Sequence, residues 1–171
     1  LREIDDARAG CRAGEPPDGQ RMFINFVPSS IYDPSYCLRS TVNAITRAGQ
    51  PAERFVFEIV ESDRIDDYSH LKEIVDFYRD NGFAVALDDF GTGYNNLYSL
   101  LSLKPDYIKV DKAITQRIVD DRASRSLFED LLRHARTEGI AVIAEGVETA
   151  EQLDACTDMG VDLVQGFYFG K

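Results

Sequence analysis

Six short apolar runs along the chain each carry one polar residue near their carboxyl end. In chain order these residues are Asn25, Glu58, Asp88, Lys109, Glu145 and Gln165. Side chains alternate between the two faces of a β-strand, and a polar group buried among apolar ones costs free energy unless it has a partner. We therefore expect these side chains to face a ligand or one another.

Amphipathic helical segments precede four of these runs, and each segment ends at a glycine. The apolar stripes lie in Leu38–Ile45, Leu71–Tyr78, Leu127–Ala135 and Leu153–Cys156. Asp33 and Pro34 predict the start of the first helix, and Thr149 with Gln152 predicts a capping box for the last. This alternation predicts repeated βα units and a parallel sheet.

Parity along the predicted strands separates two faces. Glu58 shares its face with Val56 and Val60, whereas Phe55, Phe57 and Ile59 face the other way. The same parity places Asp88 with two alanines, and Glu145 with Ala141 and Ile143. The bulky face is expected to pack under helices and the polar face to line a shared interior, as in a barrel. The chain supplies six strands, whereas such a barrel normally has eight.

Ligands of parallel βα folds bind at the carboxyl ends of the strands. A carboxamide, three carboxylates, a lysine and a glutamine meeting there predict a divalent-metal site that faces an anionic substrate. The most specific local feature is the pair Asp88-Asp89, which is followed by a glycine-rich turn at 90–94. Adjacent aspartates at a strand end can bridge two metal ions or bind them separately.

The composition indicates one domain over residues 1–171. Hydrophobic residues make up 44% of the chain and charged residues 29%, with a net charge of −11. That charge argues against a DNA or RNA polymer or an anionic membrane as partner. An anionic ligand would need Mg²⁺ or Mn²⁺ as mediator, although much of the acidity is expected on solvated helices.

Residues 1–20 differ from the rest of the chain. Leu1–Arg12 is expected to be a short helix, and 14–19 a turn-rich connector into barrel units over 21–171. Cys11, Cys37 and Cys156 are widely spaced, which predicts reduced cytoplasmic thiols. No stretch of the 171 residues is long and apolar enough for a membrane span, and the first of them are not expected to be a signal peptide.

Six ordered segments resemble the EAL domain family, the bacterial phosphodiesterases and receptors of cyclic di-GMP. They are INFVP at 24–28, FEIVES at 57–62, LDDFGTGYNNL at 87–97, IKVDK at 108–112, IAEGVE at 143–148 and QGFYFGK at 165–171. The resemblance implies a modified (β/α)8 barrel of the TIM type, often dimeric and fused or coupled to sensor or GGDEF-type domains. It also implies two divalent cations, Mg²⁺ or Mn²⁺, and hydrolysis of cyclic di-GMP to linear pGpG.

The resemblance also implies a role for each motif residue. Asn25, Glu58 and Asp88 would bind the first metal, and Asp88 would bridge to a second that is completed by Asp89 and Glu145. Lys109 would hold the attacking water, Glu148 would fix the loop after Glu145, and Gln165 would contact the ligand. The role of Glu61 is left open.

Other interpretations of these residues stay open on the sequence alone. Lys109 and Asp111 could form a buried ion pair, Asn25 could be a core amide, and Glu148 could be an acid that favours a helix N-terminus.

The Glu-Ala-Leu segment that names the family, and that supplies a metal ligand, is absent from the 171 residues. We expect it upstream in a longer parent. Otherwise the chain would be a receptor of cyclic di-GMP or a protein-interaction module that does not hydrolyse it. An unrelated metal-dependent barrel of the enolase kind would not predict the 90–94 turn.

Overall fold

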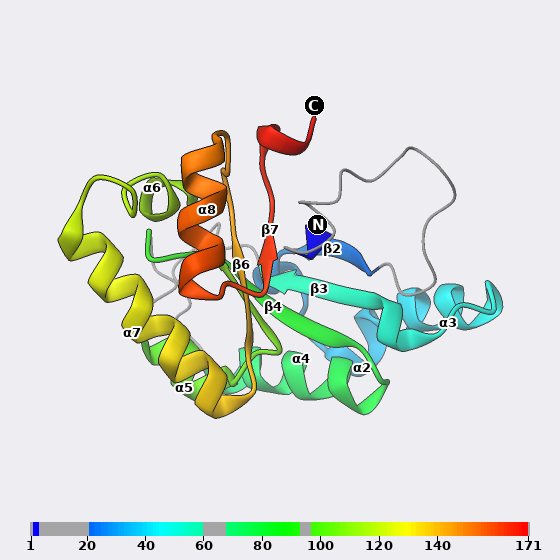
Figure 1. Ribbon diagram of the computed structural model, residues 1–171. Coiled ribbons are helices and arrows are strands. Elements are labelled where there is room, and N and C mark those ends of the chain that lie inside the picture. The colour runs from blue at the N-terminus through cyan, green and yellow to red at the C-terminus, as the bar shows by residue number, and fades with distance from the viewer. Residues whose placement is uncertain (1, 4–20, 60–67, 93–96, 171) are drawn as a thin grey trace.

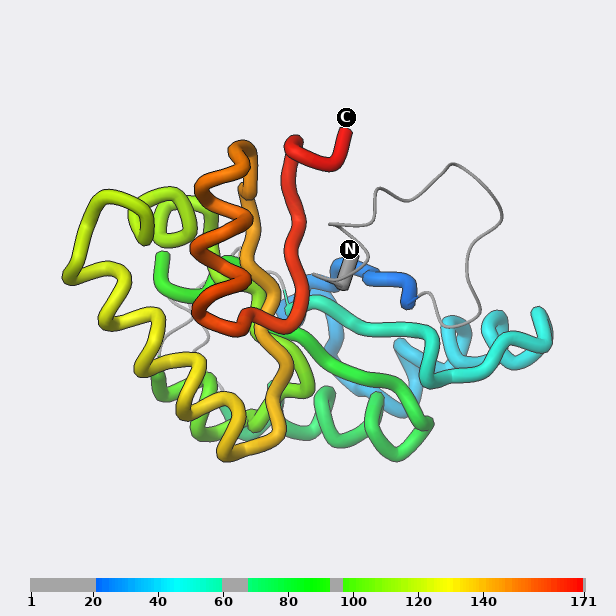
Figure 2. The backbone as a smooth tube through the Cα atoms, viewed as in Figure 1, coloured from blue at the N-terminus to red at the C-terminus, as the bar shows by residue number. Residues whose placement is uncertain are grey.

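The computed structural model describes residues 2–3, 21–59, 68–92 and 97–170. Their seven strands form one sheet in the order β1-β7-β6-β5-β4-β3-β2. From β7 to β2 this order runs from red to blue in Figure 2. The strands are β1 (Arg2–Glu3), β2 (Met22–Phe26), β3 (Phe55–Ile59), β4 (Ala84–Phe90), β5 (Tyr107–Val110), β6 (Ala141–Ala144) and β7 (Leu163–Val164). Strands β2 to β7 form five consecutive parallel pairs. The predicted parallel α/β fold with six βα strands is confirmed.

Helices surround the outer side of the curved sheet (Figure 1). They are α2 (Pro34–Cys37), α3 (Arg39–Arg47), α4 (Tyr68–Asp80), α5 (Leu97–Leu103), α6 (Lys112–Thr115), α7 (Arg122–Glu138) and α8 (Ala150–Met159). Three 3-10 turns add η1 (Pro28–Ser30), η2 (Ala52–Arg54) and η3 (Phe167–Phe169). The predicted caps are present: the Asp33 carboxylate accepts from the backbone of α2, and Thr149 and Gln152 form a capping box.

Two separate hydrophobic clusters confirm the predicted parity of the strands. The larger cluster lies between sheet and helices and includes the bulky set Phe55, Phe57 and Ile59. The smaller one lies on the opposite face of the sheet and consists of Val56, Ala86, Tyr107 and Ile143. It lies on the same strand face as Glu58, Asp88, Lys109 and Glu145. This face of the sheet is therefore apolar toward the amino ends of the strands and charged toward their carboxyl ends.

The N-terminal residues differ from the expectation of a helix over Leu1–Arg12. Arg2 and Glu3 form a short strand, β1, that pairs antiparallel with β7. Without β1, the outer backbone groups of β7 would lack ladder partners, so pairing is a way to satisfy them. Residues 4–20, including the predicted connector and Cys11, lie outside the described residues.

In the described ranges, no helix has the length and apolar character needed to cross a membrane. Cys37 and Cys156 are both free thiols. Burial raises the pKa of Cys156 to about 12, so this thiol is a core residue rather than a nucleophile.

Candidate metal centre

The ammonium group of Lys109 contacts carboxylates from three strands. Its Nζ lies 3.0 Å from Oε1 of Glu58 on β3, 2.8 Å from Oδ1 of Asp88 on β4 and 2.9 Å from Oε1 of Glu145 after β6. The Lys109 and Glu58 side chains are each only 7% exposed. Residues separated by up to 87 positions are therefore brought together at the carboxyl ends of neighbouring strands.

A β-bulge in β4 allows Asp89 to join this group. Between Leu87 and Phe90, β4 advances three residues while its partner β5 advances two, from Ile108 to Val110. Asp89 has a φ of 50°, in the left-handed region. In a regular strand Asp88 and Asp89 would face opposite ways, but the bulge redirects the chain, as bulges near functional sites commonly do.

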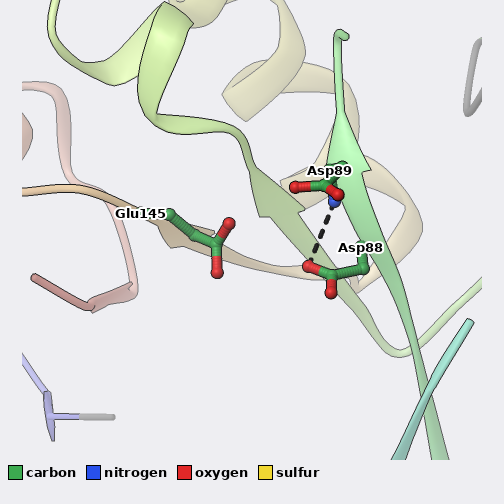
Figure 3. Close-up of side chains that lie close together, drawn as sticks. All are labelled: Asp88, Asp89 and Glu145. Atoms are coloured by element: carbon green, nitrogen blue, oxygen red, sulfur yellow. Dashed lines mark hydrogen bonds between the residues drawn. The ribbon is translucent and has the colours of Figure 1, made fainter. Parts of the chain in front are cut away.

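Three carboxylates now converge on one point. Each of Asp88, Asp89 and Glu145 offers an oxygen, and these oxygens all lie within 4.8 Å of one another. Figure 3 shows Glu145 reaching from the end of β6 toward the two aspartates on β4. The backbone N–H of Asp89 also donates to Oδ1 of Asp88, at 3.1 Å.

The donor set fits a hard divalent cation. Two oxygens that bind one Mg²⁺ at about 2.1 Å are at most about 4.2 Å apart, so small side-chain rotations would close the present spacing. Carboxylate oxygens are also the ligands that Mg²⁺ and Mn²⁺ prefer. Asp88, Asp89 and Glu145 could therefore hold such an ion.

Charged groups are crowded at this centre, and the crowding shifts their pKa values. Burial, together with the charges of Asp88 and Asp89, raises the pKa of Glu58 and Glu145 even though Lys109 opposes it. Burial and neighbouring carboxylates also raise the pKa of Asp89. Burial alone would lower the pKa of Lys109, but its three carboxylate partners outweigh burial and raise it. Lys109 thus contacts three of these four carboxyl groups, and the charge of Lys112 also acts on Asp89. Further positive charge at the centre would be favourable.

Asn25 extends the centre toward β2. Its Cα is in register with that of Glu58 on the adjacent parallel strand, so the two side chains share one face. Asn25 is exposed, whereas Glu58 is buried. An exposed amide beside a buried glutamate is available to a ligand, which does not favour the alternative of a core amide.

Asp111 is not the partner of Lys109. Its carboxylate accepts from the backbone N–H of Ala113 at 2.8 Å and caps α6. Its negative charge nevertheless contributes to the raised pKa of Asp89. The sequence pattern missed this proximity because the pairing of β4 with β5, which no local signal shows, brings the two aspartates near one another.

Gln165 and Glu148 lie at the rim: Gln165 directly follows β7, and Glu148 lies in the loop between β6 and α8. The backbone of Gln165 bonds to Ala144 and Val147, and both the Gln165 and Glu148 side chains are exposed. A Cβ at the next residue, Gly166, would lie 2.0 Å from the carbonyl oxygen of Val147, so only glycine allows this close approach. The backbone N–H of Glu148 donates to the side chain of Gln152 in the first turn of α8.

Residues 60–67, which include Glu61, lie outside the described residues. So do residues 93–96, which include the end of the predicted 90–94 turn. The described part of that turn contains Gly91, with a φ of 98°. A Cβ there would meet the Ile114 side chain at 2.1 Å, which explains the glycine that follows Phe90.

Comparison with known proteins gives one consistent family. The family model described as the EAL domain matches residues 4–171. PdeG of Escherichia coli K12, named a probable cyclic di-GMP phosphodiesterase, is 36% identical over 162 residues, which cover 93% of this chain. The chain spans only part of the length of the curated relatives, 31% in the case of PdeG and between 15% and 36% in the others.

Solved structures agree with this comparison. A standalone EAL protein from Vibrio cholerae O395, in a form bound to cyclic di-GMP, superposes with a TM-score of 0.84 at 35% identity, covering 99% of this chain and 69% of the other. Klebsiella pneumoniae BlrP1, in a complex with manganese and cyclic di-GMP, gives 0.81 at 29% identity, covering 88% of this chain and 38% of the other.

Proposed function

Because the chain belongs to the EAL domain family, we propose that it hydrolyses one phosphodiester bond of cyclic di-GMP and yields linear pGpG. The observation that carries the proposal is the convergence of Glu58, Asp88 and Glu145 on Lys109, from three strands, at the end of the sheet where such folds bind ligands. Substrate and carboxylates are all anionic, so divalent cations are required between them.

Asn25, Glu58 and Asp88 are the proposed ligands of a first ion, and Asp88, Asp89 and Glu145 those of a second. Two Mg²⁺ or Mn²⁺ ions held there would supply Lewis acidity toward the scissile phosphate and activate the attacking water. These proposed ligands lie at the carboxyl ends of the strands, and Asp88 belongs to both sets. The three mutually close oxygens of Asp88, Asp89 and Glu145 support the second set most directly.

Lys109 has three N–H donors and an ammonium that its carboxylate partners keep charged. It can therefore orient a water and stabilise the negative charge that forms on it, but it cannot take the proton. Asp89 and Glu145, whose carboxylates converge with that of Asp88, are the proposed acceptors of the proton from this water. Gln165 and Glu148, at the rim, are proposed to position the ligand and the loop after β6.

The direct test is turnover of cyclic di-GMP with Mn²⁺ or Mg²⁺, followed by chromatography of pGpG. We expect turnover that a chelator stops and that falls by at least about 10²-fold in Glu58→Ala. Lys72→Met is the matched control, because Lys72 pairs with Asp76 on the surface of α4. Binding of cyclic di-GMP without any pGpG would instead favour a receptor, and neither binding nor turnover would contradict both functions.

We also propose that the domain acts as a homodimer in the cytoplasm, coupled to a sensor or GGDEF-type domain. The α5 face supports self-association, because Leu97, Tyr98 and Leu101 are 61%, 59% and 53% exposed. Light scattering should give a dimer mass for the native chain and a monomer mass for Leu101→Glu. Leu127→Glu is the control, since Leu127 on α7 is 71% exposed and should leave the mass unchanged. A monomeric native chain would contradict the dimer.

A further inference from the structure

Lys109 has a geometry that its proposed role in holding water does not explain. A residue that only orients water needs one free donor, whereas Lys109 directs its ammonium at three carboxylates at distances of 2.8–3.0 Å. A lysine has three N–H donors, so these three contacts account for all of them. The side chain is 7% exposed, so water screens these contacts weakly.

The same oxygens are the ones that divalent ions would use. Asp88 and Glu145 belong both to the three carboxylates around Lys109 and to the three that converge as possible metal ligands. An ion bound by Asp88 and Glu145 would lie within a few ångströms of the ammonium, where two positive charges repel strongly in a buried environment. The ammonium and the ion therefore compete for one set of ligands.

The Lys109 ammonium also offsets the negative charge of the carboxylates around it. Four negative charges meet here when the groups are ionised: Glu58 is buried, Asp88 and Glu145 are half-buried, and Asp89 is exposed. A charge that is even partly removed from water is unfavourable without a partner. Within the described residues, Lys109 is the cation that contacts three of these four groups. Without it, the strand ends of β3, β4 and β6 would carry uncompensated repulsion.

We propose that Lys109 is a built-in counter-cation: it holds the carboxylates of three strands together when divalent ions are absent, and it competes with those ions when they bind. The inference rests on the proposed metal centre and concerns its affinity rather than its chemistry. It makes Lys109 a positioning residue in the metal-free centre, where its three N–H donors are taken by carboxylates, and a contact of the attacking water only once ions bind those carboxylates. A lysine that competes with the ions lowers the affinity for metal. A lysine that only preorganises the ligands would raise it instead.

The test compares native protein, Lys109→Met and Lys72→Met by thermal melting and Mn²⁺ titration. With a chelator, Lys109→Met should melt about 10 °C lower, because a buried charge network has lost its cation. Excess Mn²⁺ should recover most of that loss. In the titration, Lys109→Met should bind Mn²⁺ at least about tenfold more tightly than native protein. Lys72→Met should match native protein in both measurements.

A double variant separates charge from packing. Lys109→Met combined with Glu58→Gln removes one positive and one negative group, so with a chelator it should melt higher than Lys109→Met alone. A cavity left by the lysine stem would predict no such rescue. If Lys109→Met binds Mn²⁺ more weakly than native protein, or if the double variant melts no higher, the inference is wrong. If native protein itself binds no Mn²⁺, the proposed metal centre fails along with it.

Discussion

At the residue scale, the backbone of Asp89 is the most specific adaptation of the centre. Its φ of 50° is a conformation that aspartate and asparagine tolerate better than other residues with a Cβ. Asp89 therefore suits both the chemistry and the bulge. Parity predicted the placement of Glu58, Asp88, Lys109 and Glu145 because a strand has a period of two. It could not predict Asp89, whose direction depends on a register shift against β5.

A matched pair of substitutions separates these two properties of Asp89. Asp89→Asn and Asp89→Ala both remove the carboxylate, so both should lose the second of the two proposed Mn²⁺ ions. With a chelator, Asp89→Asn should be at least as stable as native protein, because it relieves charge crowding. Asp89→Ala should be about 1 kcal/mol less stable than Asp89→Asn, because alanine is poorly suited to the left-handed region. Urea unfolding measures the difference, and equal stability of the two variants would argue against backbone strain.

The raised pKa values of Glu58, Asp89 and Glu145 predict a pH dependence with a definite sign. A carboxyl whose folded pKa exceeds its unfolded pKa makes the folded state bind more protons between the two values, so with a chelator these groups stabilise the fold as pH falls. Protons and divalent ions compete for the same oxygens, so Mn²⁺ binding weakens over the same range.

The increase in melting temperature caused by Mn²⁺ should therefore shrink as pH falls from about 8 to about 5. Ordinary carboxyl groups, whose pKa is near 4, would lose little binding in that range. A constant Mn²⁺-induced increase across the range would contradict the raised pKa values.

At the element scale, two arginine–aspartate units recur at the amino ends of the strands. Arg79 donates to the carbonyls of Leu103 and Lys104 at the end of α5, while Asp106 accepts from the backbone N–H of Val85. Arg136 donates to the carbonyls of Met159 and Gly160 at the end of α8, while Asp162 accepts from Val142. Each unit satisfies carbonyls that the helix end leaves without partners and fixes where the next strand begins.

These units should contribute to stability rather than to chemistry. Arg136→Met removes the donor to two helix-end carbonyls and should cost about 1–3 kcal/mol in the free energy of unfolding, while turnover per folded molecule stays unchanged. Arg133→Met is the control, because Arg133 pairs with Asp130 on the surface and should cost less than about 0.5 kcal/mol. Urea unfolding and pGpG formation measure the two effects. Equal costs would show that the Arg136 contacts add nothing.

Local signals predicted most elements because they act within a few residues. Asp33, Thr149 and the glycines after the helices mark ends through capping, which does not depend on the rest of the fold. Strand β1 could not be predicted in this way. Two residues show no period, and their pairing depends on β7, more than 150 positions away.

At the scale of the whole molecule, the fold concentrates negative charge where an anionic ligand is proposed to bind. The chain carries a net charge of −11, and the strand ends place four carboxyl groups around one lysine. The parallel order of six strands follows from the βα alternation, and the family match over residues 4–171 agrees with it. Binding of an anion by such a surface depends on cations, so the metal centre is the premise of the whole account.

The most direct test of that premise is the amount of Mn²⁺ bound per chain, read from the electron paramagnetic resonance signal of free Mn²⁺ with cyclic di-GMP present. Asp88 is the proposed ligand of both ions, so native protein should bind about two ions per chain and Asp88→Asn should lose most of that binding. A melting curve with a chelator confirms that the variant is folded. If Asp88→Asn binds as much Mn²⁺ as native protein, the carboxylate cluster is not the metal centre and the account is wrong.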